Sequence, residues 1–109
     1  MISFPRISPN FAVPIAGGNE PWRSTNASRP LNKMGHAAKH LADFQKIDPN
    51  LTEGDVAKIL EHVRSVGNSS PTSFGGKAFE AVETIAGKSV TVKVIESAGG
   101  VIKTGYPVP

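Results

Sequence analysis

The segment LTEGDVAKILEHVRSVG, residues 51–67, carries the clearest helical pattern in the chain. Thr52 and Asp55 have the spacing of a capping box, with Asp in place of the usual Glu or Gln. Gly67 occupies the position at which helices often end. Apolar residues recur at the helical period, at Val56, Ile59, Leu60, Val63 and Val66. The pattern predicts a helix that begins after Thr52, ends before Gly67 and buries one face.

Beyond this helix, the apolar residues recur at every second position, which is typical of strands. Ser89–Val94 alternates cleanly and places three valines on one face. Two further runs are expected to pair with it across tight turns, at 77–86 and 101–108. The polar stretch Asn68–Pro71 is predicted to be a loop, and Thr72–Phe74 is a candidate short edge strand.

Upstream, a first helix is predicted to begin near Asn32 and to end before Pro49, because the residue before a proline disfavours the helical conformation. Its apolar stripe consists of Met34, Ala37, Ala38, Leu41 and Phe44. Residues 1–31 contain five of the nine prolines, so they are expected to form an extended leader without regular structure.

These elements predict an α+β fold. Two helices would pack on one face of an antiparallel β-meander of three to four strands. The expected organisation is a leader or linker over 1–31 and one domain over 32–109. With 109 residues and 39% hydrophobic content, the chain can form one small core. It has no cysteine, which excludes disulfides and thiolate catalysis, and no apolar run long enough to span a membrane.

The positive charge is unevenly distributed. Residues 1–40 carry five basic residues against Glu20 alone, whereas 41–109 carry seven basic and eight acidic residues. An excess of positive charge at one end of a domain is typical of a phosphate-binding surface, although a basic linker gives the same pattern. Trp22, Arg23 and Arg29 of the leader either contact nucleic acid or attach the leader to the domain surface.

The first helix also carries the most reactive group of side chains. His36, His40 and Asp43 follow one another at i, i+4 and i+7, so an α-helix would place them on one face, with Lys39 beside them. Imidazoles exchange protons near neutral pH, and an adjacent ammonium group stabilises negative charge. The alternative interpretation is a solvated polar face. His62, on the polar side of the second helix, is a weaker catalytic candidate.

The last predicted strand offers hydroxyl groups. We expect Ile102, Thr104 and Tyr106 to project to one side of this strand. Gly105 between the two hydroxyl-bearing residues would allow a ligand to approach the main chain. A phosphate could accept hydrogen bonds from both hydroxyls and from a nearby lysine. The alternative is a terminal strand whose tyrosine packs at the sheet edge.

The order of these elements resembles a superfamily of ribonuclease toxins that includes barnase, EndoU, the tRNase colicins and RelE. The similarity covers about residues 33–107 and is closest to the colicin D-like C-terminal toxin domains of contact-dependent inhibition and other polymorphic toxin systems. It rests on Lys39-His40 with Asp43-Phe44, on Gly76-Lys77-Ala78-Phe79 and on Lys103-Thr104-Gly105-Tyr106. The resemblance implies a metal-independent endoribonuclease that acts on tRNA and is neutralised by a cognate immunity protein. It also implies delivery from a larger secreted or surface protein into the cytoplasm of a target cell.

RNA cleavage without a metal requires a base for the ribose 2′-OH, an acid for the leaving oxygen, and donors around the phosphate. We expect His40 to be the principal acid or base, with His36 as its partner or as a substrate-orienting group. Lys39 would bind the phosphate, and Thr104 and Tyr106 would donate hydrogen bonds to it. The residues expected to bind RNA are Lys103, Lys33, Arg29 and Lys77. No cofactor is expected.

Two other functions are compatible with the sequence. His36, His40 and Asp43 have spacing suited to three metal ligands on one helical face, although Ala37 replaces the Glu of the metalloprotease His-Glu-x-x-His motif. A non-catalytic RNA-binding or protein-interaction module is the second alternative.

Overall fold

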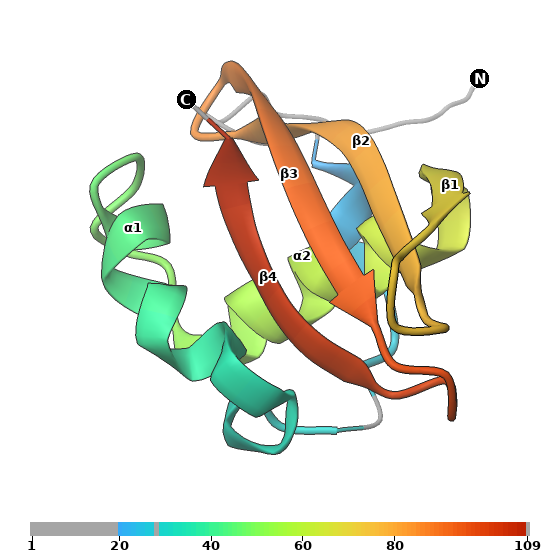
Figure 1. Cartoon of the computed structure of the whole chain (residues 1–109). Coiled ribbons are helices and arrows are strands. Elements are labelled where there is room, and N and C mark those ends of the chain that lie inside the picture. Colours follow the sequence, from blue (N-terminus) through green and yellow to red (C-terminus); the bar gives the residue numbers. More distant parts are fainter. Residues whose placement is uncertain (1–19, 28, 109) are drawn as a thin grey trace, which may run out of the picture.

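The computed structural model describes residues 20–27 and 29–108 of the chain and shows an α+β fold, as predicted (Figure 1). A single antiparallel sheet forms one layer, and the longest helix crosses behind it in Figure 1. The helical elements are η1 (Pro21–Ser24), η2 (Leu31–Lys33) and η3 (Gly35–His40), which are 3-10 helices, then α1 (Leu41–Gln45) and α2 (Glu53–Val66). The strands are β1 (Asn68–Pro71), β2 (Lys77–Ile85), β3 (Lys88–Glu96) and β4 (Ile102–Val108).

The strands lie in the order β1-β2-β3-β4, so the predicted meander is confirmed with four strands. Two predictions at its first edge are wrong. Asn68–Pro71 is not a loop, because its backbone pairs with Lys77–Glu80 of β2. Thr72–Phe74 belongs to the turn that joins these two strands. All four residues of β1 are exposed, so no apolar alternation reveals this strand, and its proline is tolerated because it lies at a sheet edge.

Helix α2 forms as predicted, with both hydrogen bonds of the capping box in place. The Thr52 hydroxyl accepts from the Asp55 N–H, and the Asp55 carboxylate accepts from the Thr52 N–H, both at 3.1 Å. Four of the five predicted apolar positions are buried, but Val66 is 58% exposed at the last turn. With 14 residues, α2 is the longest described helix, and no helix in the described ranges is long and apolar enough to cross a membrane.

The core lies between α2 and the inner face of the sheet. The side chains that it contains include Phe44, Ile59, Leu60, Val63, Ile85, Val92 and Val94. Trp22 joins this core from the leader: it is fully buried, and its indole N–H donates to the Thr84 carbonyl at 2.8 Å. Trp22 therefore attaches η1 to the domain and does not present its ring to a ligand. The expectation of a leader without regular structure is wrong for Pro21–Ser24, which form η1. Residues 1–19 of the predicted leader lie outside the described residues.

The predicted first helix is interrupted. A single α-helix from Asn32 to Pro49 is wrong, since η2 ends at Lys33, η3 begins at Gly35, and only Leu41–Gln45 is α-helical. Gly35 has a φ of +61°, in the left-handed region that breaks a right-handed helix. The backbone is also too close to β4 for any side chain here, because a Cβ on Gly35 would lie 2.0 Å from the Lys103 carbonyl oxygen.

Strand β4 contains a bulge that changes which side chains share a face. Val94 pairs with Gly105 and Ile95 with Thr104, but Glu96 pairs with Ile102, so Lys103 is the additional residue. The bulge directs Ile102 into the core, whereas Thr104 and Tyr106 lie on the outer face. The expectation that all three project to one side is therefore wrong for Ile102. The outer face retains the two hydroxyls.

Candidate functional site

The 3-10 geometry of η3 separates the two histidines that an α-helix would have aligned. A 3-10 helix has three residues per turn, so residues three apart lie above one another, and residues four apart diverge by about 120°. His36 consequently shares an exposed side with Lys39, while His40 lies above the buried Ala37. The expectation that His36 and His40 occupy one face is wrong. Only His40 faces the sheet.

His40 is held by a carboxylate one turn further along the chain. Its Nδ1 lies 2.9 Å from Oδ2 of Asp43 in α1. The hydrogen bond from His40 holds the pKa of Asp43 below its ordinary value, and the positive charge of Lys46 acts in the same direction. Because an ionised carboxylate only accepts hydrogen bonds, Nδ1 carries the proton, and in the neutral imidazole Nε2 is the free base.

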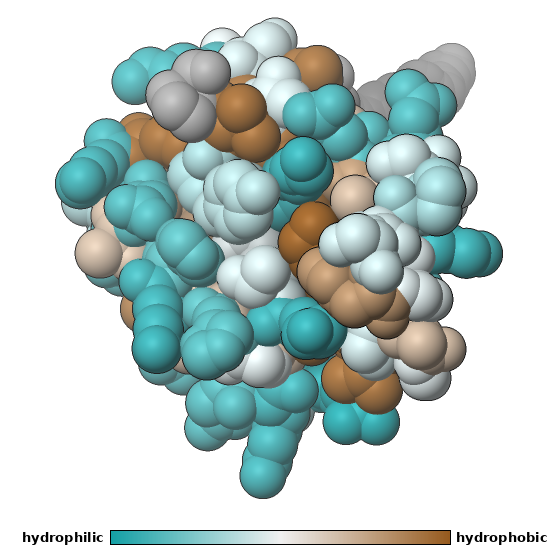
Figure 2. Space-filling view, viewed as in Figure 1, coloured by the Kyte–Doolittle hydropathy of each residue, from teal (hydrophilic) through white to brown (hydrophobic). Residues whose placement is uncertain are grey.

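The same imidazole contacts the last strand. The ring centroids of His40 and Tyr106 are 5.3 Å apart, with an interplanar angle of 42°. Thr104 lies two residues before Tyr106 on the same outer face of β4. Three of the five predicted catalytic residues are therefore brought to one place, from segments more than 60 positions apart in the sequence. Hydrophilic residues predominate at the lower left of Figure 2, over the helical segment that contains η3 and α1 in Figure 1.

A groove opens beside the imidazole–carboxylate pair. It has a volume of about 430 Å³ and lies between α1 and the ends of β3 and β4. The residues that line it are Asp43, Lys46, Ile47, Val90, Pro107 and Val108. Asp43 therefore belongs both to the pair with His40 and to the groove wall.

The predicted basic residues do not all converge on His40. Lys33 and Lys39 are exposed on the same segment as His36. The Lys103 ammonium lies 4.5 Å from the ring centroid of Phe74, where it makes a cation–π contact at the bulge. Lys77 is separated from β4 by the whole of β3, since it pairs with Glu96.

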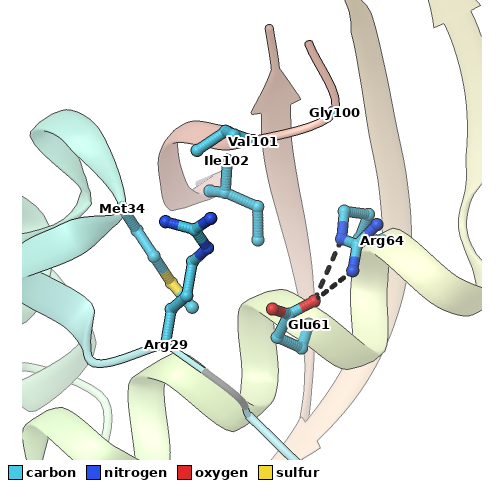
Figure 3. A pocket seen from close by; sticks show the side chains of 7 residues that line it. All are labelled: Arg29, Met34, Glu61, Arg64, Gly100, Val101 and Ile102. Carbon is cyan, nitrogen blue, oxygen red and sulfur yellow. Dashed lines mark hydrogen bonds and ion pairs between the residues drawn. The ribbon is translucent and has the colours of Figure 1, made fainter.

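Arg29 lines a different and smaller cavity, of about 70 Å³, at the opposite end of β4 (Figure 3). Its guanidinium extends between Met34 and Ile102, and Arg64 binds Glu61 on the facing wall at 2.7 Å. Ile102 and Tyr106 are four positions apart in β4, a distance of about 13 Å along a regular strand. Arg29 therefore does not form part of the His40 site.

Sequence analysis missed a second imidazole–carboxylate pair. His62 was expected on the solvated side of α2, but its Nδ1 lies 2.5 Å from Oε2 of Glu83, which is only 2% exposed. The available signal was the position of Glu83, which lies two residues before the buried Ile85 and therefore on the inward face of β2. Neither cavity described above is lined by His62 or Glu83, so this pair joins α2 to β2 and carries no site here.

A metal site receives no geometric support. Across residues 20–27 and 29–108, no three His, Cys, Asp or Glu side chains lie together in an arrangement that could hold a metal ion. His36 is separated from His40 and Asp43, which stay 2.9 Å apart, because η3 is not an α-helix.

Because comparisons with known proteins give no match, the functional inference depends on the geometry of the site. No protein-family model, curated protein or solved structure matches the chain at a significant level. What the site offers chemically is a free imidazole nitrogen, oriented by a carboxylate, beside a phenol and a hydroxyl. These are the groups required for proton transfer to and from a ligand bound at the outer edge of the sheet.

Substituting Gly35 with alanine should destabilise the protein and displace η3 from β4. Both the positive φ and the 2.0 Å approach to the Lys103 carbonyl oppose a Cβ at this position, with an expected cost of about 2–4 kcal/mol. Gly87→Ala is the matched control, since Gly87 also has a positive φ, of +76°, but no atom within 4 Å of the added Cβ. Urea denaturation measures the free energy of unfolding of both variants. Equal losses would show that the close contact contributes nothing.

Proposed function

We propose that this domain is a metal-independent endoribonuclease in which His40 is the general base. The observation that supports this function is the His40 imidazole, whose Nδ1 is bound to Asp43 and whose ring lies beside Tyr106. A carboxylate on Nδ1 orients the ring, selects the tautomer with a free Nε2 and stabilises the imidazolium formed after proton uptake.

The proposed reaction is an intramolecular phosphoryl transfer within RNA. Nε2 of His40 removes the proton of a ribose 2′-OH, and O2′ then forms a bond to the adjacent phosphorus. The bond from phosphorus to the 5′ oxygen breaks, and the Tyr106 phenol donates a proton to this leaving oxygen. Proton transfer from the His40 imidazolium to the phenolate through water restores both groups. The products are a 2′,3′-cyclic phosphate and a 5′-hydroxyl.

Thr104 and the exposed cations supply the remaining interactions in this proposal. The Thr104 hydroxyl lies on the same face as Tyr106 and donates to a non-bridging phosphate oxygen. Lys33, His36 and Lys39 lie exposed on the segment that carries His40, where they attract the RNA backbone.

The biological setting is proposed from the resemblance described for residues 33–107. In that setting the substrate is tRNA, and the domain is a toxin carried by a larger secreted or surface protein into a target cell. A cognate immunity protein would keep it inactive in the producing cell. Such a protein would need acidic groups to match the exposed basic residues around η3.

The decisive experiment is incubation of the purified chain with total tRNA in EDTA, followed by mapping of any new ends. We expect discrete cleavage that leaves 2′,3′-cyclic phosphates. If the RNA stays intact but binds, the non-catalytic binding module is the better description. Cleavage that requires added zinc would overturn the metal-independent mechanism.

A further inference from the structure

We propose that the groove between α1 and the ends of β3 and β4 binds the nucleobase of a nucleotide adjacent to the cleaved phosphate. The inference rests on the proposed nuclease function and assigns a substrate contact that the catalytic groups do not make. The volume of the groove, about 430 Å³, falls in the usual range for small-molecule sites.

The lining of the groove matches a flat apolar ring attached to a phosphate. Ile47 on one side and Val90, Pro107 and Val108 on the other provide aliphatic surfaces for the faces of a base. Lys46 stands at the α1 side, where its exposed ammonium lies 3.8 Å from Oδ1 of Asp43 and is free on its solvent side to bind a phosphate oxygen. A wholly charged ligand would leave the aliphatic walls unused, and a wholly apolar one would leave the ammonium unused.

The position of the groove also connects it to the catalytic groups. Asp43 binds His40 through Oδ2 and forms part of the groove wall. On the sheet side, Val108 lies two residues beyond Tyr106 on the same face of β4, about 7 Å along the strand. A nucleotide whose phosphate contacts His40 and Tyr106 therefore has its base within reach of the groove.

The test uses methyl-labelled full-length protein and NMR titration with each nucleoside 3′-monophosphate. We expect at least one nucleotide to shift the methyl signals of Ile47, Val90 and Val108. Inorganic phosphate should leave these three signals unchanged, since the base makes the contact. If no nucleotide shifts these three methyl signals, or if phosphate alone shifts them equally, the proposal is overturned.

A groove-filling variant gives an independent measurement. Val108→Phe should weaken nucleotide binding by about tenfold or more, because the larger ring occupies the site. Val82→Phe is the matched control: Val82 is a strand valine that is 65% exposed and does not line the groove, so binding should be unchanged. Equal affinities in all three proteins would refute the base site. If nucleotides bind in the groove but wild-type protein cuts no RNA, the nuclease function fails and the binding site remains.

Discussion

Replacing His40 with alanine should lower the rate of RNA cleavage by about 10²–10⁴-fold, the usual contribution of a general acid or base. The substitution removes the only imidazole that the structure brings to Tyr106 among the described residues. Because His40 is partly exposed and its partner Asp43 lies at the surface, the fold should be retained. Single-turnover cleavage of a defined tRNA fragment measures the rate, and circular dichroism and urea denaturation measure the fold.

Two further variants separate catalysis from binding. His36→Ala is the matched control, because His36 lies on the opposite, exposed side of η3 and should affect RNA affinity more than the rate of the bound complex. The cleavage rate of Asp43→Asn should lie between those of His36→Ala and His40→Ala. The substitution preserves the shape of the side chain but loses the charge that stabilises the imidazolium. Full activity in His40→Ala would refute the mechanism. An equal loss in His36→Ala and His40→Ala would place the site elsewhere on η3.

Replacing Trp22 with alanine should destabilise the fold by about 3–5 kcal/mol, the range for a large aromatic residue removed from a core. Trp22 is fully buried against α2 and the sheet, and its N–H satisfies the Thr84 carbonyl. A loss of this size is a large fraction of the stability of a small domain. The midpoint of guanidinium-induced unfolding, followed by circular dichroism, gives the measurement.

Trp22→Phe divides this loss into its two components. The phenylalanine retains most of the buried area but leaves the Thr84 carbonyl without its donor, so we expect a loss of about 1–3 kcal/mol. Ser24→Ala provides a neighbouring control, because Ser24 is exposed and its hydroxyl donates to the Pro21 carbonyl within η1. A loss below about 1 kcal/mol in Trp22→Ala would show that η1 contributes little to the fold.

Long periodic segments were predictable from the sequence because their side chains report burial directly. Helix α2, with its capping box and apolar stripe, lies within one residue of the predicted boundaries. The alternation in 89–94 and the runs on either side of it predicted β2, β3 and β4 within three residues. In these elements the local preference and the tertiary contacts favour the same conformation.

Elements that depend on the backbone of a partner were not predictable. Strand β1 exists because Asn68–Pro71 pairs with β2, and no alternation of its exposed side chains indicates it. The 3-10 conformation of η3 accompanies the close approach of Gly35 to Lys103, which lies 68 residues away. The bulge at Lys103 likewise depends on its register with β3.

The sequence by itself determined the fold class, the order of most strands and the central helix, and it named His40 and Tyr106 as candidate site residues. The tertiary structure decided which of these groups meet. It separated His36 from His40, joined His40 to Asp43 and Tyr106, and paired His62 with the buried Glu83. The reason is physical: periodicity records which side of an element is buried, whereas contacts between distant side chains depend on helix pitch, strand register and close backbone packing, none of which a local pattern encodes.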